Sequence, residues 1–115
     1  MQFDLSVKDI EVGDDFREHI DRRLSFALGR FAGRFGRVRV RLEDDNGPKG
    51  GEDKRCRISV EIKGAEDVVV EEIDADARAA VARAADRVGR TIARRLDKVV
   101  SARRGRGGAP PAGEE

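Results

Sequence analysis

The stretch ADARAAVARAADRVGRTIARRLDK, residues 75–98, indicates the fold more clearly than any other part of this sequence. With about 100° of rotation per residue, its apolar side chains gather along one side of a helix. They are Val81, Ala85, Val88, Ile92 and Leu96. The opposite side carries a stripe of guanidinium groups, from Arg83, Arg87, Arg90 and Arg94. We therefore expect a helix that packs one side against a core and presents a positively charged side to solvent.

Charge is distributed unevenly along the chain. The formal net charge of the 115 residues is only +1, but residues 75–106 contain ten arginines or lysines and three aspartates. Such segregation indicates one anion-seeking surface, because each guanidinium can hold a phosphate through two N–H bonds. A solvated helix face in an arginine-rich protein explains the stripe about equally well, and this alternative stays open.

Upstream of this helix, alternation of apolar and polar residues predicts strands with one buried face. The alternating stretches are residues 2–7, 37–42 and 54–63, and the apolar run 68–73 predicts a fourth strand. Turn-forming residues separate the last three strands, in a polar loop at 43–53 and a turn at 64–67.

A second amphipathic helix is predicted between the first two strands. Gly13, Asp14 and Asp15 break the first strand and offer an N-cap with acidic residues in the first turn. Helical spacing then relates Phe16, Ile20, Leu24, Ala27, Leu28 and Phe31. Gly33 and Gly36 are expected to end the helix.

The predicted order is strand, helix, three strands, helix. Three strands joined by turns form an antiparallel meander, and a helix between the first two strands allows a parallel crossover. We therefore predict an α+β fold, a two-layer sandwich in which a four-stranded mixed sheet carries both helices on one face. Residues 1–100 are expected to form this domain and residues 101–115 a disordered tail rich in arginine, glycine and proline.

The other face of the predicted sheet carries many arginines, namely Arg37, Arg39, Arg41, Arg55 and Arg57. Like charges on neighbouring strands repel each other, so either a bound anion or nearby acids must relieve them. Glu43 and Glu61 are the intramolecular candidates, and both readings stay open.

Catalytic and metal-binding functions find little support. His19 is the only histidine and Cys56 the only cysteine, and neither lies in a recognisable catalytic or metal-binding motif. We expect no enzyme activity, no metal and no cofactor. No apolar run approaches the ~20 residues of a membrane span. A single cysteine fits a reducing compartment, so a cytoplasmic protein is expected.

Four stretches, taken with the order and length of the elements, carry a family resemblance. They are EVGDDFREHI (11–20), RRL (22–24), VRVRL (38–42) and DRVGRTIARR (86–95). In this combination the chain resembles the short, single-domain form of the ribosome hibernation-promoting factor and ribosome-associated inhibitor A family. The family opens its last helix with Asp-aromatic-Ala-Ala-Ile-Asp. Here Arg78 replaces the aromatic residue and Ala82 the second acid.

The resemblance implies a protein that binds the small ribosomal subunit across the tRNA and mRNA sites and blocks translation in stationary or stressed cells. Basic residues of the helices and sheet would contact the ribosomal RNA backbone. Longer members of the family add a C-terminal dimerising domain, which this chain is expected to lack. A monomer or weak homodimer is therefore expected.

We predict that twelve basic residues bind RNA. Those on the helices are Arg23, Arg30, Arg83, Arg87, Arg90 and Arg94, and those on the sheet are Arg37, Arg39, Arg41, Lys54, Arg55 and Arg57. Because the chain has no tryptophan or tyrosine for base stacking, recognition should depend on shape and phosphate position. The alternative is a regulatory protein-binding module whose arginine stripe meets an acidic protein partner.

Overall fold

The computed structural model describes residues 1–44 and 54–104, with side chains described as far as Lys98. Its elements are β1 (Asp4–Lys8), α1 (Asp14–Leu28), a 3-10 turn (Gly29–Phe31), β2 (Phe35–Asp44), β3 (Lys54–Ile62), β4 (Val68–Asp74) and α2 (Ala77–Arg104). This order confirms the α+β prediction.

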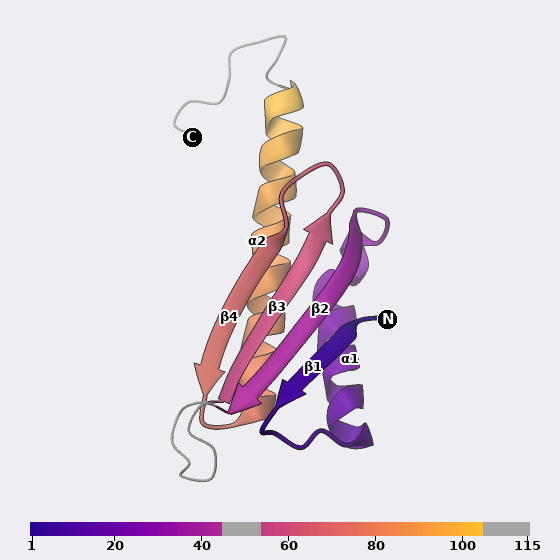
Figure 1. Cartoon of the computed structure of the whole chain (residues 1–115). Coiled ribbons are helices and arrows are strands. Elements are labelled where there is room, and N and C mark those ends of the chain that lie inside the picture. Colours follow the sequence, from indigo (N-terminus) through magenta and orange to yellow (C-terminus); the bar gives the residue numbers. More distant parts are fainter. Residues whose placement is uncertain (45–53, 105–115) are drawn as a thin grey trace.

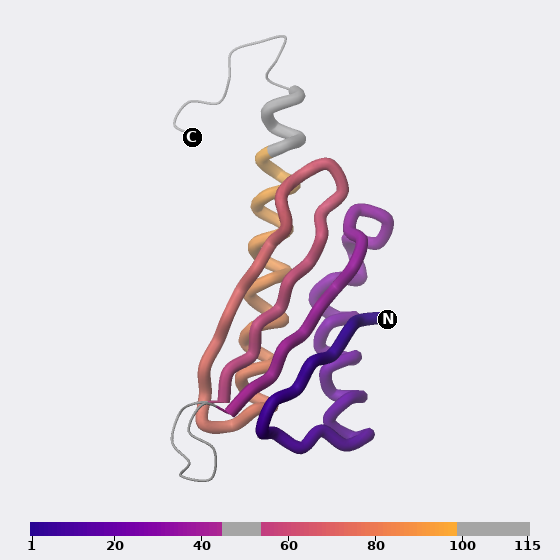
Figure 2. The backbone as a smooth tube through the Cα atoms, in the orientation of Figure 1, coloured from indigo at the N-terminus to yellow at the C-terminus, as the bar shows by residue number. Residues whose placement is uncertain are grey.

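The four strands form one mixed sheet in the order β1-β2-β3-β4. β1 and β2 run parallel, whereas β2–β3 and β3–β4 are antiparallel. A parallel pair needs a crossover connection, and α1 supplies it, as the path of the chain in Figure 2 shows. Both helices lie on the same face of the sheet (Figure 1), which confirms the predicted two-layer sandwich.

The core lies between the sheet and the two helices. Val40, Ile58 and Val70 lie opposite one another across β2, β3 and β4, and all three are buried. Leu24 of α1 and Ile92 of α2 are buried against this layer. Burying each of these aliphatic side chains stabilises the fold by about 1.5–3 kcal/mol. The residues that form this core belong to the elements that the apolar spacing of the sequence predicted.

α1 is shorter than its apolar spacing suggested. It begins at Asp14 without a side-chain N-cap, and the carboxylates of Asp14 and Asp15 interact favourably with the positive end of the helix dipole. The α-helix ends at Leu28, before the predicted Phe31, because the chain tightens into the 3-10 turn. Gly33 then adopts a φ of 85°, a conformation that glycine reaches at little cost.

α2 extends beyond its predicted end, and of the two expected capping residues, Asp74 and Asp76, it uses Asp76. It starts at Ala77, and the Asp76 carboxylate accepts a hydrogen bond of 3.0 Å from the backbone N–H of Arg78, so Asp76 is the N-cap. The helix continues to Arg104, past the predicted end at residue 98 and the predicted domain boundary at residue 100. Residues 105–115 of the predicted tail and 45–53 of the predicted loop lie outside the described residues.

The two helices pack closely where Gly89 of α2 meets Ala27 of α1. A Cβ atom at position 89 would lie 2.9 Å from the Ala27 carbonyl oxygen and 3.2 Å from the Ala27 Cβ. Only glycine allows the backbones to approach this closely without a shift. The contact joins the outer sides of α1 and α2 into one surface.

Candidate nucleic-acid interface

The arginine stripe predicted on α2 divides into two parts with different surroundings. Arg83 and Arg87 lie beside β4, where both guanidinium groups pair with Glu72, at 3.1 and 3.0 Å. The Glu72 side chain is only 15% exposed, so solvent screens these ion pairs less than it would at an open surface. A phosphate that bound Arg83 or Arg87 would have to compete with this carboxylate.

Asp74, at the end of β4, strengthens this arrangement. Its carboxylate accepts a hydrogen bond from the backbone N–H of Asp76 at 3.0 Å and another from the Arg83 guanidinium at 3.2 Å. The backbone hydrogen bond, followed by Arg83, lowers the pKa of Asp74 below its usual value of 3.8, against an opposing effect of desolvation. The ionised Asp74 therefore connects the end of β4, the start of α2 and Arg83.

Arg90 and Arg94, the other part of the stripe, point to solvent. Arg90 pairs with Asp86 one turn earlier at 2.8 Å, and both side chains are more than half exposed. An exposed pair with this helical spacing contributes only ~0.3–0.5 kcal/mol, so Asp86 holds Arg90 weakly. Arg94 is exposed and has no ion pair within the part of the chain that the structure describes. Both arginines are therefore available to an external anion.

Arg23 and Arg30 supply positive charge from the α1 side. Arg23 is exposed and makes no ion pair with residues 1–44 or 54–98. The Arg30 guanidinium carbon lies 4.8 Å from the centre of the Phe31 ring. Such stacking uses the face of the guanidinium, while its N–H groups lie in its own plane and can still donate to a phosphate.

The contact between Gly89 and Ala27 joins the two helices near which these arginines lie. Arg23 lies one turn before Ala27 on α1, and Arg30 lies in the 3-10 turn that follows α1. Arg90 and Arg94 lie on α2, after Gly89. All four side chains are exposed, and we call these arginines of the helix layer the helix patch: Arg23, Arg30, Arg90 and Arg94.

The outward face of the sheet carries arginines that are already paired with acids on the same or a neighbouring strand. The pairs are Arg37–Asp4, Arg39–Glu61, Arg41–Glu43, Arg55–Glu43 and Arg55–Glu71, at 3.2–4.0 Å. We call this set the sheet lattice. Glu43 and Glu61 are the two acids predicted from the sequence to neutralise the sheet arginines, and the structure confirms this prediction.

Lys54 does not lie on the outward face, which corrects its predicted grouping with the sheet arginines. Successive residues of a strand point to opposite faces, so Lys54 shares the helix-facing side with buried Cys56, and its ammonium lies 3.2 Å from a carboxylate oxygen of Asp44. Arg57 does lie on the outward face and is exposed, with one arginine and one glutamate as its cross-strand neighbours.

Phe26 is a feature that the sequence analysis did not single out. The other four phenylalanines are buried or partly buried, whereas Phe26 on α1 is 87% exposed. Two features of the sequence could have identified it as an exposed aromatic residue on a basic surface. Phe26 lies two residues from both Leu24 and Leu28, and therefore on the opposite side of the helix. Residues 22–42 around it contain seven arginines and no aspartate or glutamate.

The two residues considered for catalysis lie in different environments. Cys56 is fully buried, and desolvation, followed by the nearby charge of Glu72, raises its pKa to about 12. A thiol in this state is not an activated nucleophile at neutral pH. His19 uses Nε2 to donate a hydrogen bond of 3.3 Å to the backbone carbonyl of Arg78. Neither geometry is that of a catalytic dyad.

Arg78, which stands where the resembled family has an aromatic residue, has a structural role. Its guanidinium carbon lies 5.3 Å from the centre of the Phe16 ring, at the edge of the core. A stacked guanidinium can cover an aromatic face as another ring would. The substitution therefore keeps the packing between the first turns of α1 and α2.

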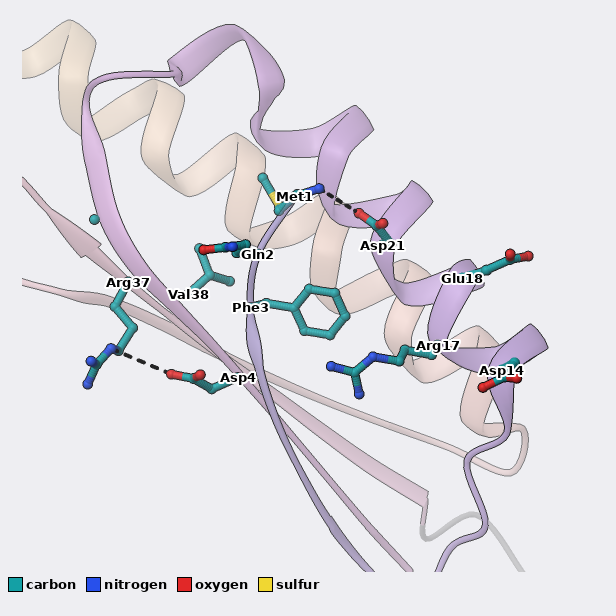
Figure 3. Close-up of a pocket in the computed structure, with 11 residues that line it drawn as sticks. Met1, Gln2, Phe3, Asp4, Asp14, Arg17, Glu18, Asp21, Arg37 and Val38 are labelled. Carbon is teal, nitrogen blue, oxygen red and sulfur yellow. Dashed lines mark hydrogen bonds and ion pairs between the residues drawn. The ribbon is translucent and has the colours of Figure 1, made fainter.

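A groove opens between the start of β1 and α1, shown in Figure 3. The cations along it are already engaged. The N-terminal amine lies 3.2 Å from Asp21, and the Arg17 guanidinium carbon lies 5.3 Å from the centre of the Phe3 ring. These two contacts hold the N-terminal residues against α1.

The described side chains contain no group of three or more histidine, cysteine, aspartate or glutamate residues placed to hold a metal ion. Among the described helices, none combines the length and apolar character needed to cross a membrane.

Comparison with known proteins agrees with this geometry. The fold is similar to the crystal structure of the Thermus thermophilus Protein Y N-terminal domain, with a TM-score of 0.66 and 28% identity over 82% of this chain and 98% of that one. It is also similar to a ribosomal subunit interface protein from Coxiella burnetii, with a TM-score of 0.69 and 10% identity over 84% of this chain and 99% of that one, a likeness that shows the fold alone.

No curated protein sequence matches the chain. The sequence pattern of a family described as sigma 54 modulation protein / S30EA ribosomal protein matches residues 3–100. This match covers most of the 115 residues and confirms the resemblance seen in the sequence. The chain belongs to the sigma 54 modulation protein / S30EA ribosomal protein family.

Proposed function

We propose that this protein is a cytoplasmic translation inhibitor that acts without catalysis, by binding ribosomal RNA of the small subunit and blocking its tRNA and mRNA sites. Family membership and the similarity to Protein Y support a ribosome-associated factor. The observation that carries the RNA assignment is the helix patch. Its four arginines are exposed on α1, on the 3-10 turn after it and on α2, and Asp86 is their one ion-pair partner among the described residues.

The helix patch suits a folded RNA backbone because its guanidinium groups are spread over two rigid helices. Each one can donate two parallel N–H bonds to a phosphate, and the fixed spacing favours a particular arrangement of phosphates over a particular base sequence. In the sheet lattice, by contrast, an RNA phosphate must displace a carboxylate. We infer that the sheet makes a weaker, secondary contact, and that Lys54 makes none from its position on the helix-facing side.

The test is sedimentation of the purified protein with small ribosomal subunits through a sucrose cushion at low and moderate salt. We expect comigration at low salt and a steep loss at moderate salt, because each phosphate contact releases counterions. The variant Arg90→Glu/Arg94→Glu should stay folded, since both side chains are exposed, and should not comigrate. This pair is preferable to Arg87, whose replacement would also break the ion pair with Glu72.

The competing function is a protein-binding module that meets an acidic partner. Salt dependence does not separate the two functions, because both are electrostatic. Treatment of the complex with RNase does, because an RNA-held complex releases the protein and a protein-held complex does not. Failure of the wild-type chain to comigrate with small subunits at low salt would count against the proposed function.

A further inference from the structure

Phe26 stands out among the exposed side chains of the helix layer. A single exposed apolar residue is common on protein surfaces and by itself indicates nothing. Here the exposure is 87% on a large aromatic ring, in the last turn of α1. No packing requirement of the fold explains the choice of phenylalanine, since the buried side of α1 is formed by Phe16, Ile20, Leu24 and Leu28.

Arginines lie near Phe26 along the chain. Arg22 and Arg23 lie one turn before it on α1, the separation at which helical side chains are adjacent, and Arg30 follows it in the 3-10 turn. Arg22 has Glu18 at 3.9 Å, and both of these side chains are largely exposed, so the pairing is weak. Arg23 and Arg30 belong to the helix patch. An exposed ring therefore lies in an arginine-rich segment, on the surface that we propose binds RNA.

We propose that Phe26 is a stacking platform for one unpaired base of ribosomal RNA, with the phosphates on either side of that base held by Arg23 and Arg30. The inference rests on the proposed function and extends it from backbone binding to a contact with a nucleobase. An aromatic face flanked by guanidinium groups is the arrangement by which proteins hold single-stranded nucleotides without reading their identity. It also supplies the stacking platform that the absence of tryptophan and tyrosine had appeared to exclude.

Charge complementarity favours a nucleotide over an apolar pocket of a protein as the occupant. An apolar pocket closing over Phe26 would have to desolvate three adjacent guanidinium groups as well, which is costly without anionic partners. A nucleotide brings its own phosphates to these groups while its base covers the ring.

Phe26→Trp gives a direct spectroscopic test, because the chain has no tryptophan or tyrosine and the indole becomes its only such fluorophore. We expect small ribosomal subunits to quench the emission of this variant and to protect it from acrylamide, since stacking on a base does both. The matched control is Val7→Trp, at a position that is 38% exposed near the end of β1 and outside both basic surfaces, and its emission should not change. A blue shift without quenching would assign Phe26 to an apolar protein pocket, and an unchanged spectrum would leave it in solvent. Either result overturns the proposal.

Affinity measurements separate stacking from general apolar contact. Phe26→Leu keeps a large apolar side chain but removes the π-face, and we expect it to weaken binding by about 5- to 150-fold. Phe26→Tyr should bind as the wild type does. Circular dichroism should show both variants folded, because the side chain makes no core contact. Wild-type protein that fails to bind small subunits defeats the proposed function itself. Wild-type binding that Phe26→Leu leaves unchanged defeats the stacking platform alone.

Discussion

The helix patch and the sheet lattice are built from the same residue type and differ in what lies beside it. On the outward face of the sheet, register places acids such as Glu43, Glu61 and Glu71 within 4.0 Å of arginines. On the outer side of the helices, Asp86 alone among the described residues pairs with a patch arginine. Arginine content therefore does not locate an anion-binding surface. The placement of carboxylates does, because an internal ion pair must be broken before a phosphate can bind.

The largest expected effect comes from replacing two arginines by glutamine, in the helix patch and, as a matched control, on the sheet. We expect Arg90→Gln/Arg94→Gln to lower affinity for small ribosomal subunits by about 100-fold, since each charge-assisted contact is worth ~1.5–3 kcal/mol. The slope of log affinity against log salt should fall by about 2, one for each phosphate contact. Arg39→Gln/Arg41→Gln, in the sheet lattice, should change affinity by less than about 5-fold, because both arginines are already paired with glutamates. Equal losses in the two variants would remove the distinction between the regions.

Gly89→Ala should force α1 and α2 apart at their close contact and so destabilise the fold. The added Cβ would meet the Ala27 carbonyl oxygen at 2.9 Å, so the helices must move apart. We expect the free energy of unfolding in urea to fall by about 1–2 kcal/mol, because overpacking outweighs the better helix propensity of alanine. Gly29→Ala is the control, since its Cβ would have open space at a φ of −55°. That variant should be as stable as the wild type or more so.

Glu72→Gln should make part of α2 resemble the helix patch. The change removes the carboxylate that pairs with both Arg83 and Arg87. The Arg87 guanidinium then loses its ion-pair partner and becomes available to RNA, whereas Arg83 keeps its ion pair with Asp74. We expect affinity for small subunits to rise by about 5-fold while thermal stability falls. Binding titrations at fixed salt, combined with thermal melts, measure both effects. Unchanged affinity would show that Arg87 lies outside the RNA contact.

The smallest expected effect is the pH dependence that comes from Asp74. Its pKa is lower in the folded chain than its usual 3.8, so its carboxylate stabilises the fold above that pH. This stabilisation is lost as the pH falls through the folded-state pKa. Thermal melts of Asp74→Asn and wild type should therefore differ at neutral pH and converge at strongly acidic pH. A difference that stays constant down to acidic pH would rule out Asp74 as a source of this dependence.

Much of the fold could be predicted from local patterns. Alternation in β2 and β3 and helical spacing in α1 and α2 were sufficient for the element order, the mixed sheet and the shared face of the helices. The ends of elements were less predictable. α1 stops at Leu28 and α2 continues to Arg104, because a 3-10 turn and helix extension depend on small energy differences that apolar spacing does not record.

The candidate site was predictable only as a set of arginines. The stripe on α2 follows from helical geometry, but its division does not, because Arg83 and Arg87 pair with Glu72 across a sequence separation of eleven and fifteen residues. The buried spacing of α1 leaves Phe26 among ordinary surface positions, and only its arginine-rich neighbourhood in residues 22–42 marks it. Charge alone places Lys54 with the sheet arginines, whereas strand alternation assigns it to the other face.

By itself, the sequence determined the secondary structure, the two-layer architecture and the family, because these depend on periodicity and on short stretches of residues. Only the tertiary structure decided which cations remain available, because ion pairing depends on distances between residues far apart in the chain. The close contact of Gly89 with Ala27 joins arginines from two helices, and the register of the sheet pairs its arginines with acids. These two packing features separate the surface proposed to bind RNA from the surface that is already neutralised.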